Sequence, residues 1–160
     1  MLGDIQLQKL FEWLDTPCPF KFIVSSVPFT INWSIRADDT WSYFLKERNS
    51  VLDYIESRHL KHVYVLSGDR HEVAATRLNN GSVIEFSTSP IQQFYSPIDT
   101  YKNTGKDVKL FTWRVGYIKW ATVSVEKGVL EYLLYVNDVQ DAPVYKFKID
   151  GDKVLFNGKI

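Results

Sequence analysis

The stretch HVYVLSGDRHEVAATRL, residues 62–78, decides the fold because its apolar run ends abruptly in glycine, charged residues and histidine. The run VYVL predicts a buried strand, and Gly68 after it allows a sharp turn and leaves space beside the next carboxylate. Asp69 and His71 then stand two residues apart, so one loop can present both side chains to one cavity. They are either two metal ligands or parts of an ordinary turn with a partly buried histidine. The spacing alone favours the turn, because Gly-Asp is common in turns.

Helix and strand alternate in the sequence before this stretch. Apolar residues at helical spacing predict a helix over residues 4–15, with Asp4 as N-cap and first-turn anion. The run KFIVSSV, residues 21–27, predicts another buried strand. A second helix is expected over residues 41–59, with Leu45 on its apolar face. A helix between two buried strands indicates a crossover and a parallel pair.

The sequence after residue 72 is rich in β-strand patterns. EVAATRL and VIEFSTS predict two strands joined by a tight Asn-Gly turn. Four further runs follow from residue 108, and WATVSVE alternates as a half-buried antiparallel strand does. The fold class is therefore mixed α/β, with an α/β first half and an antiparallel second half in one domain.

Composition excludes several classes of function. Lys plus Arg and Asp plus Glu both number 19, and this zero net charge disfavours nucleic acid as a main partner. Cys18 is the only cysteine, so a disulfide framework or thiolate zinc cluster cannot form within one chain. No run approaches about 18 apolar residues, so no membrane span is predicted. The amino terminus lacks the layout of a signal peptide, which slightly favours a cytoplasmic location.

Five blocks of the sequence resemble one known family in their order along the chain. They read MLGDIQLQKLFEWL, FKFIVSSVPFT, DDTWSYFLKERNSVLDYI, VYVLSGDRHEVAAT and IEFSTSP. The chain resembles the carboxy-terminal part of PhoD-like alkaline phosphatases, within the calcineurin-like metallophosphoesterase superfamily. LSGDRHE and EFSTSP together are most similar to the fungal branch. Five ordered blocks are far more specific than Gly-Asp-x-His alone.

The resemblance implies a metal-dependent hydrolase of phosphoric esters, with metal ions held between two packed sheets. In this family the Gly-Asp-x-His motif supplies metal ligands, so Asp69 and His71 are expected to be the metal-binding and catalytic residues. Iron and calcium are the metals of some members. Such ions neutralise the phosphate and lower the pKa of a bound water. The implied fold is the second half of an αββα two-sheet sandwich with a β-rich tail.

A second family block matches this chain only in part. Trp41, Tyr43 and Arg48 fit it, whereas Ser42 stands where the family often has glycine. Arg48 could bind phosphate through two donors, although an exposed ion pair with a neighbouring glutamate on the helix is favoured. Asp39 matches the acidic position and could approach the substrate. Its alternative role is that of an N-cap for the second helix.

The sequence gives weaker indications of function for three further residues. Glu85 alternates on the strand VIEF and is either a supporting partner for His71 or a member of a buried ion pair. His59 and His62 flank the start of the strand VYVL, at the end opposite Gly68. They are expected to be surface or loop histidines rather than ligands of the same metal.

The resemblance also implies that some of the family's metal ligands are missing from these 160 residues. The other metal ligands of the family lie upstream, so the chain is expected to be a carboxy-terminal portion: residues 1–100 carry the motifs and 101–160 form the β-rich tail. We expect it to be inactive alone. Its partners would be a phosphate ester, the missing amino-terminal half, or a second copy joined through exposed sheet edges. The alternatives are a non-catalytic interaction module, or carbohydrate stacking on Trp113, Tyr117 and Trp120.

Overall fold

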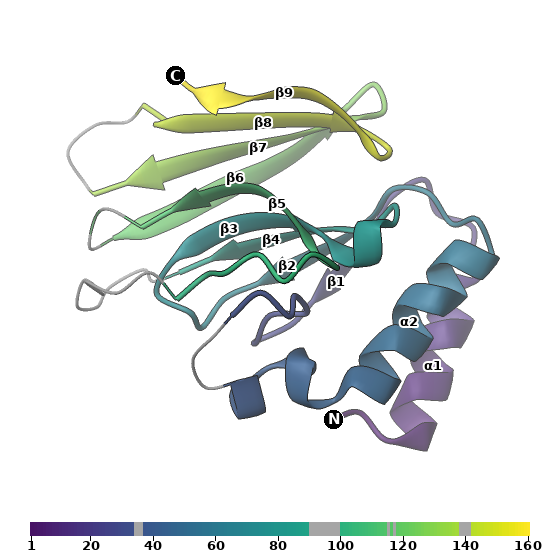
Figure 1. Cartoon of the computed structure of the whole chain (residues 1–160). Coiled ribbons are helices and arrows are strands. Elements are labelled where there is room, and N and C mark those ends of the chain that lie inside the picture. The colour runs from purple at the N-terminus through teal and green to yellow at the C-terminus, as the bar shows by residue number, and fades with distance from the viewer. Residues whose placement is uncertain (34–36, 90–99, 115, 117, 138–141) are drawn as a thin grey trace.

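The computed structural model describes residues 1–33, 37–89, 100–114, 116, 118–137 and 142–160. These residues form three layers: a helix layer, a five-stranded sheet and a four-stranded sheet (Figure 1). The helices are α1 (Asp4–Leu14) and α2 (Leu45–Ser57), with short 3-10 helices η1 (Ala37–Asp39), η2 (Trp41–Tyr43) and η3 (Leu78–Asn80). The strands are β1 (Lys21–Val24), β2 (Val63–Ser67), β3 (Val73–Arg77), β4 (Ile84–Thr88), β5 (Val108–Trp113), β6 (Lys119–Glu126), β7 (Val129–Val136), β8 (Tyr145–Asp150) and β9 (Lys153–Lys159). The mixed α/β class with two sheets is confirmed.

The five-stranded sheet has the order β1-β2-β4-β3-β5. β1 pairs with β2 in parallel, as the strand–helix–strand pattern predicts, and β2 also pairs with β4 in parallel. β3 is antiparallel to both β4 and β5. The carboxyl ends of the three parallel strands therefore meet at one edge, which is where α/β sheets place ligands.

Two apolar cores hold the layers together. Helices α1 and α2 bury residues such as Leu14 and Ile55 against the outer face of the five-stranded sheet. Between the two sheets, Phe86 stacks on Tyr132 with ring centroids 4.7 Å apart. Each fully buried large apolar side chain stabilises the fold by about 1.5–3 kcal/mol. The sheet edge formed by the carboxyl ends of β1, β2 and β4 is therefore supported by well-packed cores.

The four-stranded sheet has the order β6-β7-β8-β9, with each strand antiparallel to the next. β6 alternates between half-buried and exposed side chains over much of its length, which confirms the prediction for WATVSVE. β9 was not predicted, because KVLFNGK lacks a clear alternation and contains Gly158. Its pairing with β8 makes it a strand.

Three local predictions differ from the structure. The second helix begins at Leu45 rather than at residue 41, because Trp41–Tyr43 form a separate 3-10 turn capped by the Thr40 side chain. Leu45 is 46% exposed and not on the buried face. The N-cap of α1 is Gly3, with Asp4 in the first turn. The β3–β4 connection is longer than a tight Asn-Gly turn, since it includes η3.

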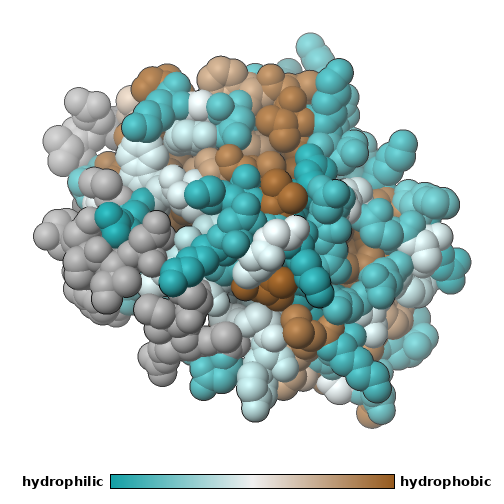
Figure 2. All heavy atoms as spheres, viewed as in Figure 1, coloured by the Kyte–Doolittle hydropathy of each residue, from teal (hydrophilic) through white to brown (hydrophobic). Residues whose placement is uncertain are grey.

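The surface of the described chain is mainly polar on the side shown in Figure 2, where hydrophobic side chains emerge in separate patches. Scattered exposed apolar residues are normal for a folded domain. Among the described residues, neither long helix has the length and apolar character needed to cross a bilayer.

Candidate metal-binding turn

The turn carrying Asp69 and His71 follows β2, at the edge where β1 and β4 also end (Figure 1). Both residues adopt left-handed backbone, with φ of 75° at Asp69 and 59° at His71. Gly68 does not have this conformation, and a Cβ there would meet the Thr88 carbonyl oxygen at 3.7 Å, an ordinary contact. The expectation that Gly68 makes the sharp turn is therefore wrong. The left-handed positions are the two candidate ligands themselves, and aspartate and histidine are among the residue types that adopt this conformation most readily.

Two hydrogen-bonded contacts hold this turn in place. The His71 backbone N–H donates to Ser89 Oγ at 2.9 Å. Glu72 is buried, and its Oε1 accepts from the Thr100 backbone N–H at 3.1 Å and from Thr100 Oγ1 at 2.7 Å. Adjacent residues of the turn thus bind the chain on both sides of residues 90–99. Glu72 was not singled out from the sequence, where only its place beside the motif marks it.

The contact between Glu72 and Thr100 predicts a graded response to substitution. Glu72→Ala removes the acceptor for two buried donors and should lower the free energy of unfolding by about 1–3 kcal/mol. Glu72→Gln keeps Oε1 and should lose less than about 1 kcal/mol. Urea unfolding of both variants measures the difference. Equal losses would show that the negative charge, and not the acceptor, stabilises this turn.

Arg70 lies between the two candidate ligands and packs on a tryptophan. Its guanidinium carbon lies 5.3 Å from the centroid of the Trp33 ring. Trp33 is buried and meets the Tyr101 ring edge-on at 4.9 Å. Because Tyr101 shares a hydrogen bond with Thr76 of β3, this aromatic support is tied to the sheet. The cation–π contact therefore restrains Arg70 beside the turn.

The side chains of this turn include two types of metal ligand, a carboxylate and an imidazole, but only one of each. Asp69 offers an exposed carboxylate and His71 a half-buried imidazole. Across the described ranges, His, Cys, Asp and Glu side chains nowhere form a group of three that could hold a metal ion. His59 and His62 lie at the amino end of β2, so the expectation that they stand apart from the turn is confirmed. The exposed Asp39 is in η1, and its role toward substrate stays a prediction.

Glu85 is a fully buried carboxylate near the start of β4. It accepts from the Phe29 and Thr30 backbone N–H groups, both at 2.8 Å, and from Ser67 Oγ at 2.7 Å. Burial raises the pKa of Glu85 to about 7, the hydrogen bonds oppose this shift, and the Asp107 charge adds to it. No cation of the described residues pairs with Glu85, so the predicted buried ion pair is wrong. A supporting role toward His71 stays a prediction.

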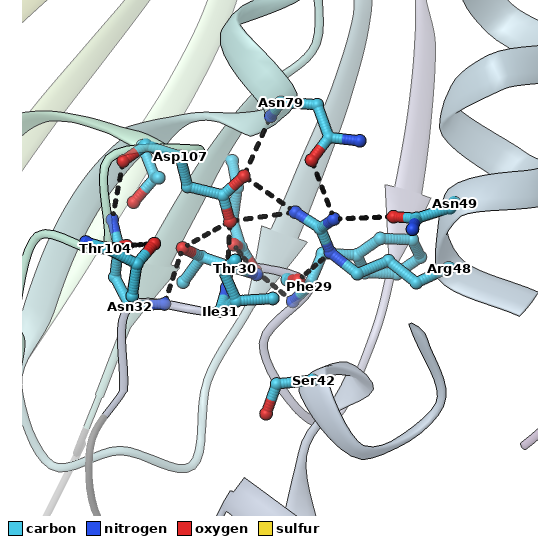
Figure 3. Close-up of polar contacts among 12 residues, drawn as sticks. Phe29, Thr30, Ile31, Asn32, Ser42, Arg48, Asn49, Asn79, Thr104 and Asp107 are labelled. Carbon is cyan, nitrogen blue, oxygen red and sulfur yellow. Dashed lines mark hydrogen bonds and ion pairs between the residues drawn. The ribbon is translucent and has the colours of Figure 1, made fainter. Parts of the chain in front are cut away.

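Arg48 is buried, so the predicted exposed ion pair is also wrong. Its Nη2 contacts both carboxylate oxygens of Asp107 at 2.8 Å, and its Nη1 donates to Asn49 and Asn79, each at 3.0 Å (Figure 3). Its Nε donates to the Phe29 carbonyl at 2.5 Å. Every guanidinium nitrogen is thus engaged inside the protein. This geometry gives Arg48 a structural role, and a contact with substrate would require these bonds to break.

Asp107 completes this cluster and was not identified from the sequence. Its carboxylate also accepts from Thr30 Oγ1 at 2.9 Å and from the backbone N–H groups of Ile31 and Asn79, both at 2.8 Å. It therefore joins the segment after β1, the η3 turn and α2.

The aromatic residues of the tail that could stack on a carbohydrate pack against other rings of the protein. Trp113 packs edge-on against Tyr145, and Trp120 stacks on Tyr135. Tyr117 lies outside the described residues.

Comparison with known proteins identifies the family. A solved structure described as the structure of PhoD matches with a TM-score of 0.70 at 17% sequence identity, which shows a shared fold. The match covers 99% of this chain and 36% of that chain, so this chain spans little more than a third of that protein's length. A search of curated proteins found no match. The family model described as PhoD-like phosphatase matches residues 1–128, through sheet β1–β5 and all but the last three strands. The chain belongs to the PhoD-like phosphatase family.

Proposed function

We propose that this chain supplies part of the metal centre of an enzyme that hydrolyses phosphoric esters. Family membership over residues 1–128 is the observation that carries the proposal. The motif resemblance to the fungal branch supports the same assignment. Asp69 and His71 are the proposed metal ligands, since both lie in the turn at the carboxyl ends of parallel strands.

The chemistry of these two side chains fits the metals of the family. A carboxylate is a ligand for calcium and, together with imidazole, suits iron. Two protein ligands do not close a catalytic centre, so we infer that the other ligands come from polypeptide outside these 160 residues. A metal bound there supplies charge neutralisation for the phosphate and lowers the pKa of a bound water.

The residues of this chain would hold two of the metal ligands in place, but they would not supply the complete set of ligands. Asp69 contributes negative charge in an exposed position, and His71 is fixed through its backbone by Ser89. Glu72 keeps the other side of the turn fixed through Thr100. Preorganised ligands lose little freedom when a metal or phosphate binds, which is how rigid sites gain affinity and rate.

Metal binding and phosphate release test the proposal together. Asp69→Asn and His71→Asn are suitable variants because asparagine tolerates left-handed backbone while removing the charge or the imidazole. We expect the wild type to bind iron or calcium, and each variant to bind at least about tenfold more weakly. His59→Asn, also in left-handed backbone, is the matched control and should bind as the wild type. Calorimetric titration measures the affinity, and hydrolysis of p-nitrophenyl phosphate measures turnover.

The second candidate function is that of a non-catalytic interaction module. It is favoured by the lack of a third metal donor among the residues that the structure describes. Metal-dependent hydrolysis that Asp69→Asn abolishes would eliminate it. If the chain binds neither metal at the turn, or if Asp69→Asn and His71→Asn bind metal as tightly as the wild type, the phosphatase proposal is wrong for this chain and the module is supported.

A further inference from the structure

A polar hollow of about 470 Å³ lies between α2, η3 and the segment leading into β5. Its wall includes Asn49 and Asp53 from α2, Asn79 from η3 and Lys106. None of the residues 67–72 lines it, so it is separate from the Asp69–His71 turn. Small-molecule sites commonly have volumes of about 300–1,000 Å³, and this hollow lies within that range.

The buried Arg48 fixes the orientation of two amide groups in the wall. Its Nη1 donates to the Oδ1 atoms of Asn49 and Asn79. A guanidinium has only donors, so each amide must turn its oxygen toward Arg48 and its NH2 group away. Figure 3 shows the Asn79 amide nitrogen on the side away from the guanidinium of Arg48. Neither NH2 group has a hydrogen-bond partner among the described residues.

The two amides are held rigidly before any ligand arrives. Arg48 is 1% exposed and is itself fixed by Asp107 and the Phe29 carbonyl. Asn79 is further restrained because its backbone N–H donates to Asp107 at 2.8 Å. Donors that are already ordered lose little entropy on binding, so they favour a ligand with acceptor oxygens.

The remaining wall residues define the class of ligand. Lys106 adds a donor and Asp53 an acceptor, and their opposite charges leave the rim without net charge. Arg48 and Asp107 likewise cancel beneath it. Ile31 and the exposed Leu45 supply an apolar side. Donors, an acceptor, an apolar side and no net charge match a compound with many hydroxyl groups and a C–H face. We propose that this hollow binds a neutral sugar or related polyol.

A titration followed by NMR tests this site in the whole chain. The 15N-labelled protein is titrated with D-glucose, D-ribose and myo-inositol, and separately with inorganic phosphate as a charged probe. We expect at least one polyol to shift the side-chain amide signals of Asn49 and Asn79 saturably, with a dissociation constant of about 1 mM. Phosphate should leave these signals unchanged. No saturable shift with any polyol, or a shift with phosphate alone, overturns the proposal.

Asparagine-to-aspartate changes provide matched variants. Asn79→Asp keeps the oxygen that faces Arg48, tolerates the φ of 48°, and replaces the free NH2 donor by an acceptor. It should weaken polyol binding by about tenfold without lowering the midpoint of urea unfolding. Asn103→Asp makes the same charge change at an exposed residue outside the wall and should bind as the wild type. Unchanged affinity in Asn79→Asp would refute the site. Asp69→Asn should also bind normally, which separates this outcome from that of the metal proposal.

Discussion

Arg48→Met should lower the free energy of unfolding by about 3–5 kcal/mol, the largest loss expected from any single substitution here. The ion pair with Asp107 is buried, with side chains 1% and 0% exposed. Removing the guanidinium leaves an uncompensated carboxylate in the interior, and desolvation of a lone charge is far more costly than loss of a surface pair. A loss of this size is a large part of the total stability of a typical domain, which is about 5–15 kcal/mol. Urea or thermal unfolding measures it.

An exposed ion pair provides the control for this experiment. Lys9 and Glu12 lie 2.7 Å apart on α1, with side chains 71% and 50% exposed. Lys9→Met should change stability by less than about 0.5 kcal/mol. The double variant Arg48→Met/Asp107→Leu should not recover stability, because Asp107 also accepts from the backbone N–H groups of Ile31 and Asn79. A loss below about 1 kcal/mol in Arg48→Met would contradict the structural role of the pair.

The stability of the wild type should fall as the pH rises from about 4.5 to about 7, because of Glu85. Its pKa is raised from an ordinary 4.5 to about 7, mainly by burial. The folded protein therefore binds more protons at this carboxyl than the unfolded chain does, throughout that interval. A difference of about 2.5 pKa units corresponds to a loss on the order of 3 kcal/mol across the window. Above the folded pKa this contribution is constant.

Removing the titrating group isolates this effect from the other carboxyls. Glu85→Gln should abolish the Glu85 part of the slope, so its stability curve should run flatter than that of the wild type between pH 4.5 and 7. The exposed Glu126 is a suitable control, since Glu126→Gln should leave the slope unchanged. Denaturant titrations at several pH values measure both. Parallel curves for the wild type and Glu85→Gln would show that Glu85 stays ionised in the fold.

Much of the fold could be predicted because it rests on local periodicity. The apolar runs before Pro28 and Gly68 become β1 and β2, and the helical spacing before Asp15 becomes α1. The start of α2 was misplaced because Phe44, with φ −111° and ψ 46°, interrupts the helical backbone after η2. Such a break depends on tertiary packing, and no breaker residue marks it in the sequence.

The site could be predicted only where family motifs or short spacing mark it. Asp69 and His71 were found through a resemblance, and their left-handed backbone was not foreseen. The link from Arg48 to Asp107 spans 59 residues of sequence, so periodicity carries no signal for it. Burial of a charged side chain depends on where its partner is placed, which explains why Arg48 was expected on the surface.

The connectivity of the two sheets implies that the four-stranded sheet forms before the five-stranded sheet. β6, β7, β8 and β9 each pair with the next strand along the chain, so that sheet needs only short loops to close. The other sheet begins with Lys21 opposite Val63, and the whole of α2 lies between them. Closing a long loop must precede that pairing, which slows its formation relative to successive hairpins. The candidate metal ligands lie in the turn between β2 and β3 of this slower sheet, so the turn takes its shape only after distant parts of the chain have met.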